Sequence, residues 1–334
     1  MGEKILLAHG SGSRLSHDLI SKVLAPSIMN PVLARMDDSA VLSMSGKLAF
    51  TTDSYVVNPI FFPGGDIGRL AVCGTVNDLS MSGARPLYIS LALIIEEGLD
   101  IDDLRQVMAS VKDTAVEAGV QIVTGDTKVV DHGKADRLFI NTSGIGLIEY
   151  GTDISGSNAR PGDKIILSGG IGEHGMAVMS QREGLHLSLP VTSDCAPLNH
   201  LVSVMLSVSK NIHSLRDPTR GGLASTLNEF AKQSDVGITI EEDKIPVCDG
   251  VRGACELLGL DPLYIANEGK LVATVTEVDS GKVLSAMKKN KYARQAVVIG
   301  EVTTEHRGRV VMKTSIGSSR IVDMPVGEIL PRIC

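Results

Sequence analysis

Acidic residues recur beside small polar residues at several points of the sequence. They are Asp37 and Asp38 in MDDSAV, Asp53 in TTDSY, Asp78 in VNDLSMSG, Asp126 in TGDTK and Asp217 in RDPTRGG. Any one of them could be a turn or capping residue, because Asp favours such positions. As a set they could hold a divalent cation, since Mg²⁺ prefers oxygen ligands and a cation removes the repulsion among carboxylates. Mg²⁺ held in this way commonly carries the phosphates of a nucleoside triphosphate.

A second chemical feature is the end of the chain, GEILPRIC, whose last residue is Cys334. An exposed thiol oxidises and cross-links, so a chain end is a poor place for a cysteine without a role. Pro325, Gly327 and Pro331 precede it, which predicts an extended, mobile segment and argues against a regular helix. Cys334 could therefore be a covalent carrier on a tether, although a cysteine that falls there by chance is the alternative.

Lys128, which follows TGDT, and Glu268, in IANEGKL, are further candidates for chemistry, although a lone charged residue at a strand end is usually solvated. Two glycine-rich loops, HGSGS at 9–13 and GGIGEHG at 169–175, could approach phosphates. The second contains GxGxxG, with Asp194 where an acidic ribose ligand could follow, but a tight strand-to-helix turn is the simpler interpretation. His9 and His174 lie beside these glycines and could contact phosphate, but turn positions are the simpler interpretation. A Walker loop, GxxxxGK[ST], is absent, so a P-loop ATPase is excluded.

Composition excludes several classes of function. The net charge of −7 and the lack of a long basic run argue against nucleic acid or an anionic membrane as partner. Aromatic residues make up 3% and Trp is absent, which leaves few rings to stack on bases. No apolar run reaches the length of a membrane span or a signal peptide. Five cysteines without CxxC spacing are typical of a reducing compartment, so we expect a cytoplasmic protein.

The 334 residues predict two domains of α+β class. Residues 1–35 form a glycine-rich segment and a helix, and residues 36–150 a domain with the order β-α-β-α-β-β. Residues 151–162, rich in Gly, Ser and Asn, are the expected linker. A second α/β domain is expected over 163–314, followed by a mobile tail over 315–334. Within the first domain, Asp66 is the predicted N-cap of a helix that ends near Gly83, and Gly119 ends the next helix.

These motifs resemble a known group of proteins. DDSAV, TTDSYVV, VNDLSMSGARP, TGDTKVV, RDPTRGGLA and NEG look like the ATP-binding superfamily of aminoimidazole ribonucleotide synthetase and selenophosphate synthetase. Within it, HGSGS and the terminal PRIC resemble the HypE family, carbamoyl dehydratases of [NiFe]-hydrogenase maturation. The resemblance covers the full length, with Ser13 as a departure where a second glycine is expected.

The resemblance implies an activity and its parts. Cys334 carries a carbamoyl group as a thiocarbamate, and ATP drives its dehydration to a thiocyanate for the cyanide ligands of the hydrogenase iron. The implied catalytic residues are Cys334, Lys128 and Glu268. The implied Mg²⁺ ligands are Asp38, Asp78 and Asp217, which also contact ATP, with Asp37, Asp53, Asn77, Asp126 and Thr127 lining the nucleotide. The implied partners are HypF as carbamoyl donor, the HypC–HypD complex as cyanide acceptor, and a second copy in a homodimer whose first domains pair their sheets.

Two alternatives remain. One is another ATP-dependent synthetase or kinase of the same superfamily. Examples are a selenophosphate synthetase and a small-molecule kinase, but a selenophosphate synthetase would be expected to have a reactive Cys or selenocysteine near its N-terminus, and HGSGS has none. The other is a non-catalytic protein that uses a terminal thiol for binding.

Overall fold

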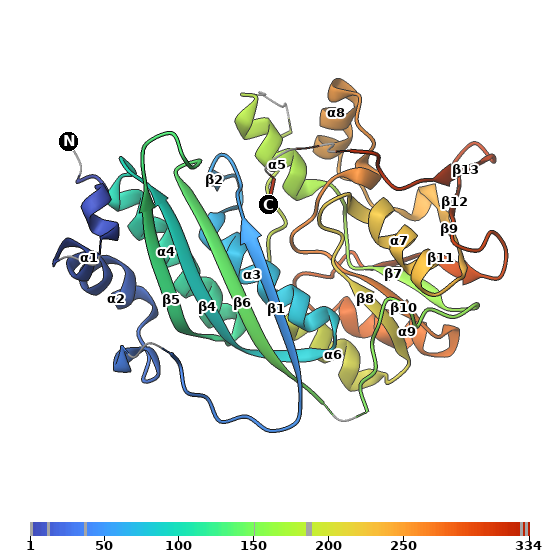
Figure 1. Cartoon of the computed structure of the whole chain (residues 1–334). Helices are drawn as coiled ribbons and strands as arrows, with labels where there is room; N and C mark the ends of the chain where they lie inside the picture. Colours follow the sequence, from blue (N-terminus) through green and yellow to red (C-terminus); the bar gives the residue numbers. More distant parts are fainter. Residues whose placement is uncertain are drawn as a thin grey trace.

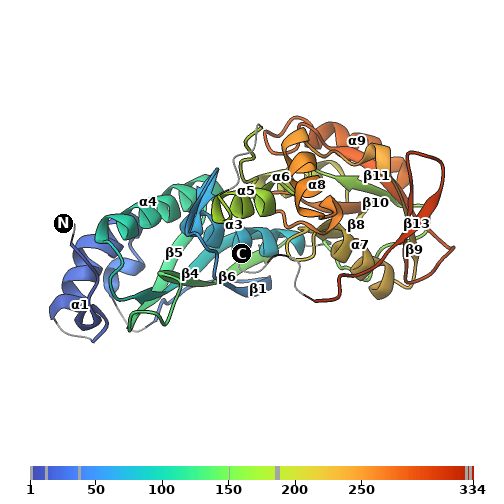
Figure 2. The same cartoon turned by 90° about the horizontal axis from the view of Figure 1, so that it is seen from above.

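The computed structural model describes residues 3–11, 14–36, 39–149, 151–184, 189–327, 330 and 333–334. Two domains lie side by side, each built on its own sheet, and the C-terminus lies between them (Figures 1 and 2). Within the described ranges, no helix is both long and apolar enough to cross a membrane.

The first domain is a four-stranded sheet in the order β1-β6-β4-β5, in which β4 and β5 are parallel and the other pairs antiparallel. Its elements after the N-terminal helices are β1 (Lys47–Tyr55), β2 (Phe61–Phe62), β3 (Gly65–Asp66), α3 (Ile67–Met81), β4 (Ala84–Glu96), α4 (Ile101–Ala118), β5 (Gln121–Val130) and β6 (Leu138–Ile148). Apart from the short β2–β3 pair, this is the predicted order.

The N-terminal segment is less regular than predicted. Its helical pieces are η1 (Leu7–Gly10), α1 (Arg14–Leu19), the π-helical η2 (Ile20–Leu24), α2 (Ala25–Ile28) and η3 (Leu33–Arg35). They pack over the edge strand β5 and the end of α4 (Figure 1).

The three predicted helix boundaries in this domain are confirmed, since α3 also ends at Met81, near Gly83. Asp66 caps α3 by accepting hydrogen bonds from the backbone N–H groups of Gly68 (2.8 Å) and Arg69 (3.0 Å). α4 ends at Gly119, whose φ of 70° is the left-handed conformation that glycine adopts without strain. α3 and α4 pack against each other and against one face of the sheet (Figure 2).

The other face of this sheet stays open. Leu48, Phe50 and Ile94 are 48%, 70% and 42% exposed, although all three are apolar. Cross-strand register places them on one face, since Phe50 pairs with Ile145 and Ile94 pairs with Phe139. No described element covers this face (Figure 2).

The second domain is a seven-stranded sheet in the order β13-β12-β9-β11-β7-β10-β8, antiparallel except for the β12–β9 pair. Its elements are β7 (Lys164–Leu167), α5 (Glu173–Arg182), α6 (Asn199–Val208), β8 (Ile212–Arg216), α7 (Gly222–Gln233), β9 (Gly237–Glu241), η4 (Glu242–Lys244), α8 (Asp249–Leu258), η5 (Pro262–Tyr264), β10 (Val272–Val275), α9 (Glu277–Met287), β11 (Val297–Thr303), β12 (Val310–Lys313) and β13 (Ser319–Val322).

The structure corrects the sequence interpretation of this domain at two places. β8 was not predicted, and β13 lies inside the segment expected to be a mobile tail. β13 pairs with β12 over four residues, from Ser319 opposite Lys313 to Val322 opposite Val310. The sheet therefore extends to Val322, and the free end of the chain is shorter than predicted.

Glu117, in the last turn of α4, ties the two domains together. Its carboxylate accepts hydrogen bonds from Lys291 Nζ (2.7 Å) and from the Tyr292 hydroxyl, both in the loop after α9. Its other oxygen accepts a hydrogen bond from Arg69 of α3 at 3.0 Å. These bonds lower the pKa of Glu117 to about 2, although partial burial acts in the opposite direction.

Candidate active site

A cavity of about 220 Å³ lies between the two domains at the end of the chain. Residues of β1 and α3 form one side, the loop after β8 forms another, and the loop before β10 completes it. The lining residues are Thr52, Asp53, Ser54, Tyr55, Gly74, Asp78, Asp217, Thr219, Arg220, Glu268 and Cys334. The cavity thus joins the terminal thiol to four of the predicted acidic residues.

Three of these acids, Asp53, Asp78 and Asp217, give the cavity a strong negative field. Burial and the neighbouring charge of Asp78 raise the pKa of Asp217 to about 7. The pKa of Asp78 is also raised by burial, while a hydrogen bond from the Thr51 hydroxyl (2.8 Å) to Asp78 lowers it. Carboxylates that disfavour one another's charge in this way fit a site that a divalent cation would neutralise.

Glu268 is the most isolated acid of the cavity. Its side chain is 2% exposed, and its Oε1 has no hydrogen-bond partner among the described residues. Burial, with the Cys195 and Asp217 charges, raises the pKa of Glu268 well above its usual value. A carboxyl group whose pKa is raised in this way is a candidate for proton transfer to or from a substrate that sits beside it.

The backbone of Glu268 is fixed by Asp194. The Asp194 carboxylate accepts hydrogen bonds from the N–H groups of Glu268 (3.2 Å) and Gly269 (3.1 Å) and lies 3.5 Å from Lys270 Nζ. Asp194, the residue that could have been the ribose ligand of the GxGxxG loop, thus makes its contacts within the protein.

Cys334 lies in this cavity because Ile333, the residue before it, is buried in the protein. Ile333 is 3% exposed and packs in the core of the first domain, together with Cys195 and Ala266. Burial, followed by the nearby Glu268 charge, raises the pKa of the Cys334 thiol. In this docked position Cys334 is a protonated thiol with low reactivity.

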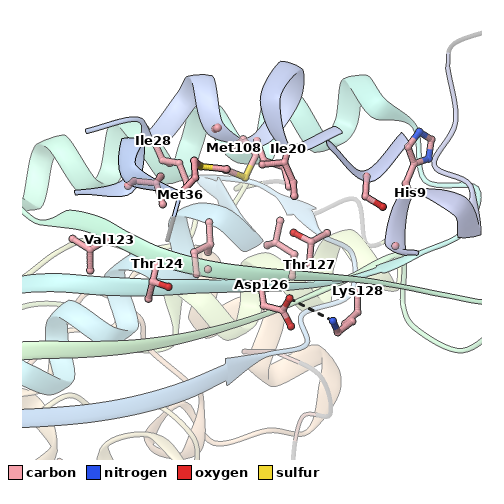
Figure 3. A pocket seen from close by; sticks show the side chains of 18 of the residues that line it. His9, Ile20, Ile28, Met36, Met108, Val123, Thr124, Asp126, Thr127 and Lys128 are labelled. Atoms are coloured by element: carbon pink, nitrogen blue, oxygen red, sulfur yellow. Dashed lines mark ion pairs between the residues drawn. The ribbon is translucent and has the colours of Figure 1, made fainter. Parts of the chain in front are cut away.

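A second cavity, of about 350 Å³, lies between the N-terminal helices and β5 (Figure 3). Apolar side chains such as Ile20, Ile28 and Met108 form much of its wall. Thr127 points toward the helices, whereas Asp126 and Lys128 lie on the far side of the strand (Figure 3). Lys128 Nζ is 3.5 Å from Asp126 Oδ1 and both side chains are largely exposed.

The predicted site residues fall into separate groups. Asp53, Asp78, Asp217, Glu268 and Cys334 meet in the interdomain cavity, whereas Asp126, Thr127 and Lys128 lie at the opposite edge of the first sheet. Within one chain, Lys128 is therefore not brought beside Glu268 and Cys334. Asp37, Asp38 and Ser13 lie outside the described residues. Among the residues that are described, no three His, Cys, Asp or Glu side chains are close enough to form a metal site.

Asn77 makes structural contacts in this chain, and its predicted contact with the nucleotide stays a prediction. It is fully buried in α3, where its amide donates to the carbonyl of Ala196 at 3.1 Å. Its Oδ1 accepts from the N–H of Leu198 at 2.8 Å. Both polar atoms are thus used to join α3 to the second domain.

Arg220 and Thr219 are cavity residues that the sequence reasoning missed. Both belong to RDPTRGG, the motif that supplied Asp217, and the motif's basic residue was the available signal. Arg220 is the one basic residue among those that line the cavity, and its charge offsets part of the increase that burial causes in the pKa values of Asp78 and Cys334.

The comparisons with known proteins agree with this geometry. Residues 36–148 match the family described as AIR synthase related protein, N-terminal domain, and residues 160–313 match its C-terminal domain. A curated protein of Rhodobacter capsulatus named Carbamoyl dehydratase HypE is 48% identical over 99% of this chain and 98% of its own length. The chain belongs to the HypE family of carbamoyl dehydratases.

Two solved structures place the family in context. A crystal structure of hydrogenase maturation protein HypE in complex with ATP is 51% identical, covers 98% of this chain and 99% of its own, and has a TM-score of 0.95. A HypE–HypF complex contains a chain that is 51% identical, covers 92% of this chain and 99% of its own, and has a TM-score of 0.82. The two-domain α+β fold and the family expected from the sequence are therefore confirmed.

Proposed function

We propose that this enzyme uses ATP to dehydrate a carbamoyl group carried on Cys334. The observation that carries the proposal is the position of the thiol, docked in the interdomain cavity beside Glu268 and the acidic residues. A group attached to the sulfur would be presented to these residues without diffusing, which raises its effective concentration.

The reaction balances in two steps. The thiocarbamate oxygen attacks the γ-phosphorus of ATP, ADP leaves, and the nitrogen gives up one proton. The nitrogen then loses its second proton while the C–O bond breaks, and phosphate leaves with the oxygen. The product is a thiocyanate on Cys334, ADP and phosphate, and no oxidant is needed.

Glu268 takes one nitrogen proton in each step of this scheme, and it releases the first proton to solvent before the second step. Its Oε1 has no hydrogen-bond partner among the described residues and Glu268 lines the cavity, so a substrate N–H can become its partner. A neutral glutamic acid must first release its proton to act as a base. The positive charge of Arg220 in the same cavity favours that release.

The repulsion among Asp53, Asp78 and Asp217 fits a bound cation. Mg²⁺ would be held by Asp78 and Asp217, with Asp38 as a further candidate, and would neutralise charge on the ATP phosphates. The solved relative in complex with ATP supports ATP as the second substrate. The largely apolar cavity beside Thr127 fits the base of the nucleotide.

A homodimer resolves the separate position of Lys128. The open face of the first sheet carries Leu48, Phe50 and Ile94, which is apolar surface that a second copy would cover. Lys128 and Asp126 lie on this same face, since Ile94 pairs with Lys128 and Ala92 pairs with Asp126. In the proposed dimer, Lys128 serves the cavity of the other chain.

HypF is the proposed carbamoyl donor, supported by the relative solved in complex with HypF. The HypC–HypD complex is the proposed acceptor of the cyanide group, and the proposed place of action is the cytoplasm. Both follow from the resemblance and the composition alone.

Mass spectrometry of the intact protein tests the function. Protein carbamoylated on Cys334 should lose the mass of one water molecule when ATP and Mg²⁺ are added, and Cys334→Ala should neither load nor change. ATP hydrolysis without this loss would favour another synthetase or kinase of the superfamily. A loss that maps to Cys73, Cys195, Cys248 or Cys255 would refute Cys334 as the carrier.

A further inference from the structure

The GxGxxG loop at 169–175 begins α5, which lies beside the C-terminus (Figure 1). Two of its glycines, Gly172 and Gly175, are required by backbone conformation and packing. Gly172 has a φ of 84°, and its N–H donates to Asn267 Oδ1 at 2.7 Å. A Cβ on Gly175 would lie 2.5 Å from Ile265 Cγ2 and 3.3 Å from Leu330 Cδ1. The loop therefore fits closely against the end of the chain.

His174, in the same loop, contacts the chain end directly. It is fully buried, and its Nε2 lies 2.7 Å from the backbone carbonyl oxygen of Ile333. A carbonyl can only accept, so Nε2 carries the proton. Nδ1 lies 2.8 Å from Ser193 Oγ and accepts from that hydroxyl, whose oxygen accepts from the N–H of Cys195 at 3.1 Å. The ring packs edge-on against Phe62, with 5.3 Å between centroids.

This network leaves His174 one tautomer and one orientation. The Ile333 carbonyl requires Nε2 to be the donor, so Nδ1 of neutral His174 accepts from the Ser193 hydroxyl, and Phe62 packs edge-on against the ring. The donated hydrogen bond ends on the residue directly before Cys334. A shift of the Ile333 carbonyl would also move the Cys334 thiol relative to Glu268, because Cys334 directly follows Ile333 in the chain.

We infer that His174 is a positioning residue that holds the end of the chain docked, so that the Cys334 sulfur lies in the cavity beside Glu268. The inference deepens the proposed function and rests on it for its consequence, since the docked end is the state in which dehydration would occur. The docking itself can be measured without the reaction.

The reactivity of the Cys334 thiol measures how often the chain end leaves its docked position. Docked Cys334 is partly buried and its thiol pKa is raised, so iodoacetamide reacts mainly with the undocked fraction. Cys248 is exposed and is first replaced by Ser, while Cys73, Cys195 and Cys255 are buried. The alkylation rate is then read from the mass of the C-terminal peptide, with neither ATP nor a carbamoyl group present.

Two variants of His174 form a matched pair. In His174→Gln the side-chain amide can reach the position of Nε2 and donate to Ile333, whereas in His174→Asn it occupies the position of Nδ1 and cannot reach. Loss of one buried hydrogen bond should make alkylation of Cys334 roughly 5–10-fold faster in His174→Asn. His174→Gln should stay near the wild-type rate. Ser193→Ala, which removes the hydrogen bond to Nδ1 but leaves the ring and its bond to Ile333, should give a smaller increase.

Thermal unfolding of each variant separates docking from general destabilisation. Equal Cys334 alkylation rates in the Asn and Gln variants would overturn the inference, as would a wild-type rate equal to that of exposed Cys248. If His174→Asn does not fold, an unchanged rate in Ser193→Ala overturns it. If carbamoylated wild type loses no water while the variants differ as expected, the proposed function fails and the docking stands.

Discussion

Glu268 offers the most direct test of the proposed chemistry, because its side chain is buried and its Oε1 has no hydrogen-bond partner among the described residues. An amide in its place has nearly the same shape but cannot exchange a proton. Glu268→Gln should slow dehydration about 10²–10⁴-fold, the usual contribution of a positioned acid or base. The water loss of carbamoylated protein is followed by mass spectrometry. Because Glu268 makes no side-chain hydrogen bond through Oε1, the melting temperature should stay the same or rise. A wild-type rate in this variant would remove Glu268 from the mechanism.

Asp78 tests the cation site in a separate way. Asp78→Asn keeps a group that Thr51 can bond but removes a charge from the cavity. We expect a folded protein with greatly weakened Mg²⁺–ATP binding, because an amide is a poorer ligand for Mg²⁺ than a carboxylate. Calorimetric titration with Mg²⁺–ATP measures this. An unchanged dissociation constant would exclude Asp78 as a ligand.

At the scale of elements, α3 connects the sheet, the cavity and the second domain. Its N-cap, Asp66, accepts from two backbone N–H groups and from the Ser110 hydroxyl of α4. Asp66→Ala should lower the free energy of unfolding by about 1–2 kcal/mol, the cost of losing a cap. Urea denaturation measures it, with Asp102→Ala as the control because Asp102 is an exposed residue in the first turn of α4. An equal loss in the free energy of unfolding in Asp66→Ala and Asp102→Ala would contradict a capping role for Asp66.

Elements with local signals could be predicted, and those defined by distant partners could not. The cap at Asp66 and the stop at Gly119 are written in neighbouring residues, so α3 and α4 were predicted with their ends. β13 forms because β12 offers it a partner, which a short segment between Gly317 and Pro325 does not reveal. The same limit applies to the site. Motifs identified the acids, but the side of the sheet on which Lys128 lies depends on register and a bulge in β4–β5.

For the whole molecule, the Glu117 contacts should make stability depend on pH. The pKa of Glu117 falls from 4.5 to about 2 on folding, so the carboxylate stabilises the folded state above its unfolded pKa. That stabilisation is lost as the pH falls toward about 2. Glu117→Gln should cost about 1–3 kcal/mol at neutral pH, and the difference from wild type should shrink as the pH falls below about 4.5. Urea denaturation at several pH values tests this, and a difference independent of pH would contradict it.

The proposed role of Lys128 in the cavity of the other chain can be tested by combining two variant chains in one dimer. If Lys128 serves the cavity of the other chain, then Lys128→Ala and Glu268→Gln homodimers are both inactive, yet a mixed dimer holds one intact cavity. That cavity combines Glu268 and Cys334 of the Lys128→Ala chain with Lys128 of the Glu268→Gln chain. Co-expression in equal amounts should restore roughly a quarter of wild-type dehydration, because half the dimers are mixed and each has one active site of two. The restored thiocyanate should lie on the Lys128→Ala chain, which the masses of the two variants distinguish. Phe50→Glu, which places a charge on the open apolar face, should give monomers by light scattering and abolish the restoration. No activity in the mixture, with mixed dimers shown to form, would mean that Lys128 acts within its own chain, whereas an active Lys128→Ala homodimer would mean that Lys128 takes no part.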